Sequence, residues 1–140
     1  MNQWGAVMSE TNQQLKGYEL IRNDVLQLVL GKEHDHLLYW VGKSLARKYK
    51  LEQIEELHTF FKQVYWGDLS LVKQKKNEWY YELSGEWMTK EDERSYQLEA
   101  GFLAETLETQ FAVATAATYT KKGKAIRLTV HFDHKDTVAI

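Results

Sequence analysis

The 140-residue chain contains no cysteine, and this absence excludes several kinds of functional site at once. Without a thiol there is no disulfide, no thiolate metal site, no iron–sulfur cluster, no covalent haem attachment and no cysteine nucleophile. Proline is absent too, so no proline-rich linker divides the chain into modules. No apolar run approaches the roughly 20 residues that span a bilayer. The length and composition therefore predict one globular domain without a membrane span.

The chain also lacks an excess of charge of either sign. Eighteen Lys and Arg residues stand against twenty Asp and Glu residues, for a formal net charge of -2. A nucleic-acid or anionic-membrane partner would therefore need a local basic patch. We interpret the lysines of two predicted turns as solubilising, edge-protecting residues instead: Lys73, Lys75 and Lys76, and Lys121, Lys122 and Lys124. The opening residues lack the pattern of a secretory signal, so we expect a cytoplasmic protein.

Three helices are expected before the first strand. Residues 1–14 are polar and aperiodic, and we expect them to be mobile or loosely docked. From residue 15 apolar residues recur at steps of three and four until Gly31, which caps the helix. Residues 32–50 and 51–66 form the second and third helices, and Gly67 ends the third. The apolar stripe of the first helix consists of Leu15, Tyr18, Ile21, Val25, Leu28 and Val29.

After Gly67 the apolar period changes to two, which is typical of strands. Residues 69–71 and 79–83 predict one antiparallel hairpin, and 112–120 and 125–133 predict a second. Between them lies a helix over 95–111, with Glu99, Glu105 and Glu108 on its polar face. The order ααα-ββ-α-ββ predicts an α+β domain over residues 15–134, with helices packed on one face of a twisted antiparallel sheet. Residues 135–140 are expected to form a tail.

Two glycines lie near the middle of predicted helices, where glycine costs about 1 kcal/mol relative to alanine. Gly101 lies at the edge of the apolar stripe of its helix, beside Phe102, and a missing side chain there permits close approach by a strand or helix. Gly42 suits a helix crossing with a short interaxial distance, which we expect at a contact between two copies of the chain. We therefore predict intimate contact between layers at both positions.

The paired histidines offer candidate metal ligands, each with a simpler interpretation. His34 and His36 are two residues apart on a helix and point about 200° away from each other, which favours a polar cluster at the helix start. His131 and Asp133 share one strand face, with His134 on the other. We interpret these three as solvated strand-end residues, because a stable zinc-type site needs three or four ligands.

Acid–base chemistry has three candidates. His58 lies at the border of the apolar stripe of the third helix. A neutral imidazole bonded to a neighbouring hydroxyl or carbonyl is expected there, and a ligand or proton-transfer role is the alternative. Glu99 and Glu105 flank Gly101, but paired carboxylates must converge to act together. Without a recognisable catalytic motif, we assign no catalytic residue, no metal and no cofactor, and expect a protein that is not an enzyme.

Aromatic residues are abundant, with five Trp, eight Tyr and five Phe, so some should face a partner subunit or a ligand. Aromatics at helical spacing can equally be ordinary core. The candidates for a ligand site or an interface are Tyr39, Trp40, Gly42, His58, Tyr65, Trp66, Trp79, Gly101 and Phe102.

The motifs "LYWVGKSLARK" and "QLEAGFLAE" combine uncommon residues with a helix glycine. With the flanking segments from about Tyr18 to Asp133, the chain resembles the YslB-like proteins, a family of unknown function from low-GC Gram-positive bacteria. This resemblance implies the fold of 4-vinyl reductase domains, TRAPP subunits and haem-based nitric-oxide sensors, in which several members dimerise or hold an apolar ligand among the helices. Some vinyl reductase-like relatives carry cysteines in the closing hairpin, but this chain has none there, so a metal site of that kind does not carry over. No histidine of this chain matches the axial haem ligand of the nitric-oxide sensors, so the haem site does not carry over either.

These observations favour a non-enzymatic module that binds a partner, chiefly itself, as a two-fold dimer through aromatic-rich helices. The alternative is a binder or sensor of a small apolar molecule held between the helices and the sheet face of Trp79, Tyr81 and Leu83. A hydrolase or reductase that uses His58 or Glu99 is the third reading.

Overall fold

The computed structural model describes residues 10–137, with side chains placed for residues 15–135. A composite N-terminal helix contains α2 (Glu10–Leu20), a π-turn η1 (Ile21–Val25) and α3 (Leu26–Leu30). The short 3-10 turn η2 (Gly31–Glu33) leads into α4 (His34–Lys48), and α5 (Glu56–Gln63) follows. Gly31 has φ +62° and ends the composite helix, as predicted. Of the predicted mobile segment, residues 1–9 lie outside the described residues, and residues 10–14 are helical.

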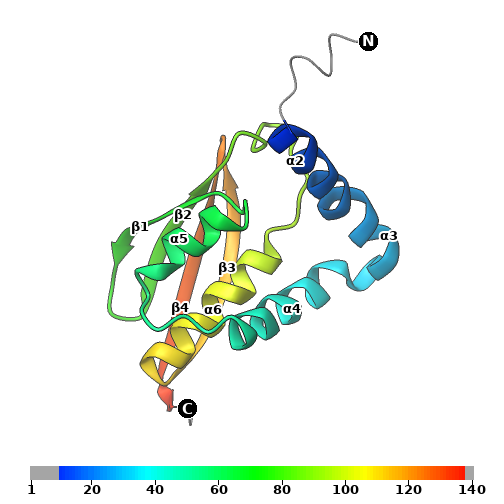
Figure 1. Ribbon diagram of the computed structural model, residues 1–140. Coiled ribbons are helices and arrows are strands. Elements are labelled where there is room, and N and C mark those ends of the chain that lie inside the picture. The colour runs from blue at the N-terminus through cyan, green and yellow to red at the C-terminus, as the bar shows by residue number, and fades with distance from the viewer. Residues whose placement is uncertain (1–9, 138–140) are drawn as a thin grey trace, which may run out of the picture.

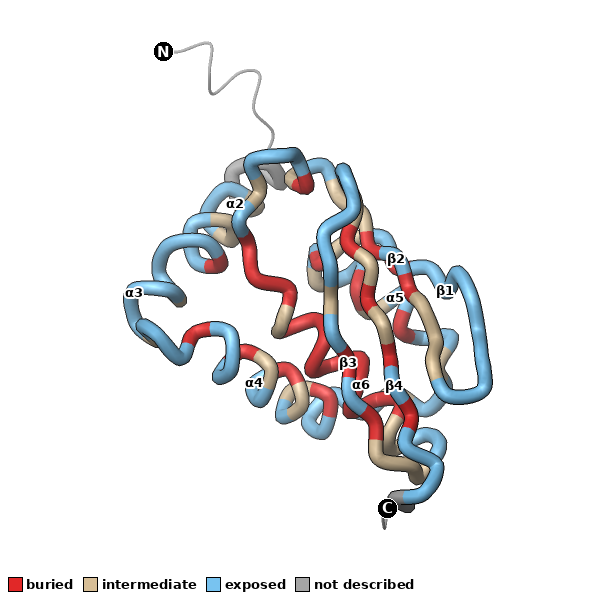
Figure 2. Tube along the Cα trace, turned by 180° about the vertical axis from the view of Figure 1, so that it is seen from behind, coloured by how far each residue is buried: buried red, intermediate tan, exposed pale blue. Residues whose placement is uncertain are grey.

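Two hairpins form one antiparallel sheet. β1 (Asp68–Gln74) pairs with β2 (Glu78–Ser84), and β3 (Val113–Lys122) pairs with β4 (Ala125–Thr137). Pairing of β2 with β4 joins the hairpins in the order β1-β2-β4-β3. The second hairpin extends three residues past the predicted end of the domain at residue 134. Figure 1 shows the helices on one face of this sheet, and Figure 2 shows the strands from the opposite side. The predicted α+β architecture is confirmed.

The helix α6 (Gln97–Phe111) forms a middle layer between the sheet and α4. Every residue from 98 to 107 is buried, as the red trace of α6 in Figure 2 shows. The predicted polar face is therefore wrong for Glu99 and Glu105, which are both buried, while Glu108 is half-buried. A helix enclosed on all sides has no solvent face, and its carboxylates need buried partners.

The third helix is shorter than predicted at both ends: its first residues form a turn, and it ends at Gln63, ahead of the predicted stop at Gly67. The carboxylate oxygen Oε2 of Glu56 accepts hydrogen bonds from the backbone nitrogens of Glu52 and Gln53, at 2.9 and 2.7 Å. These bonds satisfy the free amides ahead of the helix, so α5 begins at Glu56 instead of at residue 51. Its apolar side still faces the core through Leu57 and Phe61.

The composite N-terminal helix exposes most of its predicted apolar stripe. Arg22 is the fully buried side chain of this segment, at 2% exposed, whereas Leu28 and Val29 are 84% and 72% exposed. The π-turn supplies a physical reason, because its i to i+5 bonding adds a residue to the turn and rotates the following side chains by about 100°. A pattern read with a constant α-helical period therefore assigns the wrong face beyond Ile21.

Candidate functional site

The two helix glycines face one crossing between α4 and α6. A Cβ atom added at Gly101 would lie 2.0 Å from the carbonyl oxygen of Tyr39, and one added at Gly42 would lie 2.2 Å from the carbonyl oxygen of Leu98. Ordinary contacts of a Cβ atom are 3.4 Å or longer. The predicted close contact is therefore present at both positions. Because this crossing lies within one chain, both glycines are committed to the core.

Polar contacts flank the crossing. Arg47 Nε of α4 lies 3.2 Å from Glu105 Oε2, and Lys43 Nζ lies 3.9 Å from Glu105 Oε1. The hydroxyl of Tyr39 accepts a hydrogen bond of 3.1 Å from the backbone nitrogen of Ala117 on β3. Since β3 is an edge strand, this bond also satisfies part of its free edge. Tyr39 thus links all three layers.

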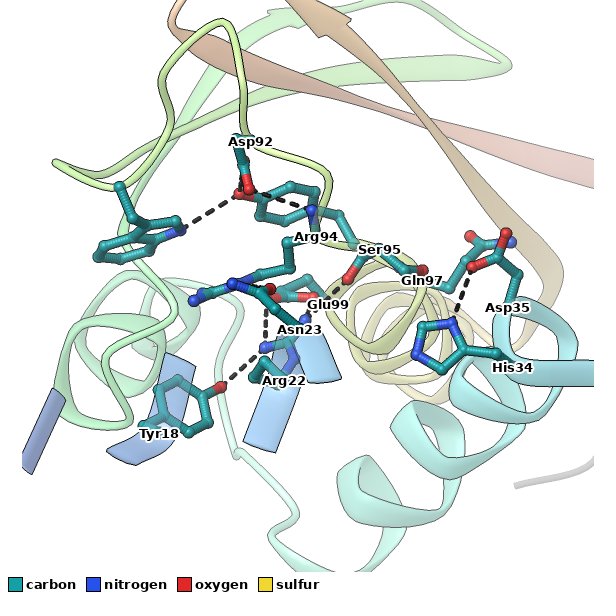
Figure 3. Close-up of polar contacts among 12 residues, drawn as sticks. Tyr18, Arg22, Asn23, His34, Asp35, Asp92, Arg94, Ser95, Gln97 and Glu99 are labelled. Carbon is teal, nitrogen blue, oxygen red and sulfur yellow. Dashed lines mark hydrogen bonds and ion pairs between the residues drawn. The ribbon is translucent and has the colours of Figure 1, made fainter. Parts of the chain in front are cut away.

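A buried ion pair connects the N-terminal helix to α6, as Figure 3 shows. Arg22 Nη1 and Nη2 lie 3.0 and 2.9 Å from Glu99 Oε2 and Oε1, which is bidentate geometry. Arg22 also donates to the Tyr18 hydroxyl at 2.7 Å and to the Ser95 carbonyl at 2.8 Å. Glu99 is 0% exposed. It therefore cannot reach a substrate in this conformation.

Burial and charge set the pKa values in this cluster. Burial alone would lower the pKa of Arg22, but the negative charge and hydrogen bonds of Glu99 outweigh it and raise that pKa. Burial raises the pKa of Tyr18, and the nearby Arg22 charge only partly opposes the rise. Both side chains therefore stay protonated at neutral pH. Arg94 lies beside them, with its guanidinium 5.5 Å from the Tyr18 ring and 5.0 Å from the Trp87 ring.

Sequence reasoning named Glu99 as an acid–base candidate but missed its pairing with Arg22. The available signal was a charged residue, Arg22, which lies four positions after Tyr18 and three before Val25, at the spacing of the apolar stripe. A second signal was Glu99, two residues before the core glycine Gly101. A charged residue at such a position can lie in solvent at the edge of the stripe or form a buried ion pair. Only the position of the oppositely charged residue in the folded chain distinguishes the two cases.

The histidines lie apart from one another, as predicted for separate structural roles. His34 is buried, with Nδ1 3.4 Å from Asp35 Oδ1, while His36 is exposed. His131 Nδ1 lies 3.0 Å from Glu78 Oε2 on the open face of the sheet. Within residues 10–137 no group of three or more His, Asp or Glu side chains is arranged to hold a metal ion.

Three of the aromatic candidates belong to the core. The Phe102 ring is stacked on Phe60 with centroids 4.5 Å apart, and the Trp66 ring meets Phe102 edge-on at 5.4 Å. Trp79 is half-buried and packs edge-on against Phe111. These three side chains stabilise the layer between α6, α5 and the sheet, which is the ordinary-core alternative.

Two of the aromatic candidates remain exposed, Trp40 on α4 and Tyr65 after α5, each at 48%. Trp40 belongs to a larger group of exposed apolar side chains on the N-terminal helices. We define this group as the α3–α4 apolar surface: Ile21, Val25, Leu28, Val29, Leu37, Trp40 and Val41. The pale blue trace of α3 in Figure 2 follows this exposure. The candidate residues thus divide between core and surface and do not form one site.

The last candidate, His58, lines a pocket between α5 and the first hairpin. Its Nδ1 lies 2.9 Å from the carbonyl oxygen of Leu69, so the predicted bond to a carbonyl is present. The pocket has a volume of about 160 Å³. It is lined by Ile54, Glu55, Leu57, His58, Leu69, Leu71 and Tyr81. The wall is mainly apolar, with a carboxylate, an imidazole and a phenol as its polar groups. We call it the α5–β1 pocket.

Comparison with known proteins identifies the family. Residues 15–131 match the family described as "protein of unknown function (DUF2507)". The chain is 38% identical to the uncharacterized protein YslB of Bacillus subtilis over 138 residues, which cover 94% of this chain and 93% of that protein. The chain belongs to this family. The predicted YslB-like resemblance is confirmed, and the matched range of this chain contains the positions of the glycine crossing and of the Arg22–Glu99 pair.

Solved structures support the expected fold. A vinyl-4-reductase family protein from Methanocaldococcus jannaschii aligns with a TM-score of 0.62 and 22% identity, over 85% of this chain and 81% of its own. An iron(II), unliganded H-NOX protein variant from K. algicida aligns with a TM-score of 0.52 and 11% identity, over 77% and 68% of the two chains. At these identities the likeness establishes the fold alone.

Proposed function

We propose that this YslB-like protein is a non-enzymatic, cytoplasmic interaction module that forms a two-fold dimer through the α3–α4 apolar surface. The observation that carries the proposal is the exposure of apolar residues at helical spacing on the N-terminal helices. A surface helix of a monomer normally turns such a stripe toward its own core. Here Arg22 occupies the buried position instead, and the leucine and valine side chains face outward.

The energetics favour burial of this surface against a second chain. Covering one large aliphatic side chain contributes about 1.5–3 kcal/mol, and Leu28 and Val29 are the most exposed of the group. Trp40 adds a residue type that is enriched at interfaces. Residues 25–31 contain no charged side chain that would have to be desolvated. A second copy presents the same uncharged segment, which suits an isologous contact centred on residues 25–31.

A non-enzymatic role also agrees with the environment of the acidic candidates. Glu99 is fully buried and held by Arg22, and Glu105 is paired with Arg47 and Lys43. Both carboxylates already serve the packing of α6. No helix within the described part of the chain has the length and apolar character needed to cross a membrane.

Analytical ultracentrifugation across a concentration series tests the dimer. Wild-type protein should sediment as a dimer, and Leu28→Glu should sediment as a folded monomer, because that side chain is exposed in the single chain. The matched control is Val72→Glu on β1, which replaces another exposed aliphatic residue far from α3 in the sequence and should leave the dimer intact.

Two outcomes would overturn the proposal. One is a wild-type protein that remains monomeric at every accessible concentration. The other is a Leu28→Glu variant that still dimerises. Removal of residues 1–9, which carry Trp4, Val7 and Met8, tests whether this segment occupies the surface instead. Dimerisation that appears only after the removal would identify the segment as the native cover and would contradict a dimer of the full chain.

The α5–β1 pocket favours a second candidate function, the binding of a small ligand. The predicted ligand space faced Trp79, Tyr81 and Leu83, but Leu83 is fully buried and Trp79 packs against Phe111. Only Tyr81 of these three lines the pocket. Any ligand space here is therefore smaller and closer to β1 than the sequence pattern suggests.

A further inference from the structure

The α5–β1 pocket is lined by a mostly buried tyrosine whose hydroxyl has no partner among the residues that the structure describes. Tyr81 is 5% exposed, and its hydroxyl forms no hydrogen bond with any residue that the structure describes. Glu55 also lines the pocket, and its negative charge raises the pKa of this hydroxyl. The hydroxyl therefore lies on the pocket side of the strand. A hydroxyl that faces a pocket and has no protein partner bonds to water or to a ligand.

The three polar groups offer complementary hydrogen-bonding capacity. Burial raises the pKa of Tyr81, and the charge of Glu55 raises it further, so the phenol remains a donor at neutral pH. A carbonyl oxygen only accepts, so His58 Nδ1 carries a proton and donates to Leu69. In the neutral ring Nε2 is then an acceptor. The pocket thus combines a donor, an acceptor and a carboxylate.

Size and charge restrict the ligand further. An apolar cavity of roughly 150 Å³ can hold one benzene molecule, and the pocket measures about 160 Å³. Leu57 and Leu69 are buried and form its inner wall, while Leu71 is partly exposed at the opening. Glu55 would repel an anion but can accept a hydrogen bond from a hydroxyl group.

We propose that the α5–β1 pocket binds a small, neutral, hydroxylated aromatic molecule, whose hydroxyl group accepts a hydrogen bond from Tyr81 and donates one to His58 or Glu55. The inference rests on the second proposed function and is independent of the dimer. Phenol is the simplest probe of this chemistry.

Titration of phenol into 15N-labelled protein, followed by NMR, tests the proposal. We expect shifts at the amides of the pocket-lining residues and a dissociation constant of roughly 1 mM or below, which is reasonable for about seven non-hydrogen atoms. Toluene, which lacks the hydroxyl, should bind more weakly. 4-Hydroxybenzoate should also bind more weakly than phenol, because Glu55 would repel its carboxylate and the described residues that line the pocket include no cation.

Tyr81→Phe provides the decisive variant. It removes only a hydroxyl without a protein partner, so folding should be retained, and phenol affinity should fall about 2- to 13-fold, the effect of one net hydrogen bond. The matched control is Tyr80→Phe, at the preceding residue of β2, whose side chain points to the opposite face; this variant should bind phenol like the wild type.

Two results would overturn the inference. They are the absence of phenol-induced shifts at the pocket, and equal phenol affinity of Tyr81→Phe and the wild type. Leu71→Trp should block the opening and abolish binding, which separates pocket binding from weak surface adsorption. Sedimentation of these variants should match the wild type, so failure of the pocket and failure of the dimer can be distinguished.

Discussion

Alanine at Gly101 should destabilise the fold, although alanine is the better helix former. Helix propensity alone favours Gly101→Ala by about 1 kcal/mol. Against this gain, the new Cβ atom would lie 2.0 Å from the carbonyl oxygen of Tyr39, where ordinary contact begins at 3.4 Å. The obstacle is backbone and not a flexible side chain, so α4 and α6 must move apart by more than an ångström.

The cost of the steric clash exceeds the gain in helix propensity, so Gly101→Ala should lower the free energy of unfolding. Overpacking of a tight core costs about 1–3 kcal/mol and sometimes more, and a contact this short belongs at the upper end. The net loss should be about 2 kcal/mol or more. At about 2–4 °C per kcal/mol, the melting temperature should fall by roughly 4–8 °C. Gly42→Ala should behave alike, and the double variant should lose less than the sum, because both substitutions separate the same helices.

Gly17→Ala is the matched control, measured with Gly101→Ala by urea denaturation and differential scanning calorimetry. Gly17 also lies inside a helix, α2, but a Cβ atom there would meet nothing within 4 Å. This variant should therefore gain about 0.4–1 kcal/mol. If Gly101→Ala were as stable as Gly17→Ala, the close crossing of α4 and α6 would be refuted.

Two further predictions concern charged residues. Arg22→Met should cost about 3–5 kcal/mol in urea denaturation, because it leaves Glu99 buried and unpaired, and adding Glu99→Leu should recover most of the loss; a fully stable single variant would contradict the pair. The pKa of Glu78 lies below its ordinary value, mainly because the Tyr80 hydroxyl donates to it. Its contribution to stability is thus present above the unfolded-state pKa and lost as pH falls through the folded-state pKa. Tyr80→Phe should raise the Glu78 pKa in a carboxyl NMR titration, and an unchanged titration would argue against this bond.

The fold was predictable because its determinants are local in sequence. The change of apolar period after Gly67 marks the transition from helices to strands, and the two hairpin turns set the strand pairing. Gly42 and Gly101 were recognisable because each lies near the middle of a strong helical pattern, where close approach explains a glycine best. What the pattern left open was the identity of the approaching element, which is another helix and not a strand.

The candidate site was less predictable because it depends on the rotation of the N-terminal helix about its axis and on contacts between residues far apart in the sequence. A π-turn at Ile21 shifts the helix phase, and no residue type marks such a turn reliably. The burial of Glu99 depends on Arg22, 77 residues earlier in the chain. For the α5–β1 pocket, His58 was recognisable from its place on the apolar stripe, whereas the free hydroxyl of Tyr81 follows from three-dimensional packing alone.

The Arg22–Glu99 pair explains why the α3–α4 apolar surface faces outward. Rotating the N-terminal helix to bury Val25 and Leu28 would remove Arg22 from Glu99 and leave a carboxylate unpaired inside α6. That loss of about 3–5 kcal/mol is as large as the gain from covering one or two aliphatic side chains. The buried pair therefore fixes the rotation of the helix, and the apolar side chains that it turns outward are available to a second subunit. The burial of Arg22 and the exposure of the apolar side chains on the same helix thus both follow from the pairing of Arg22 with Glu99.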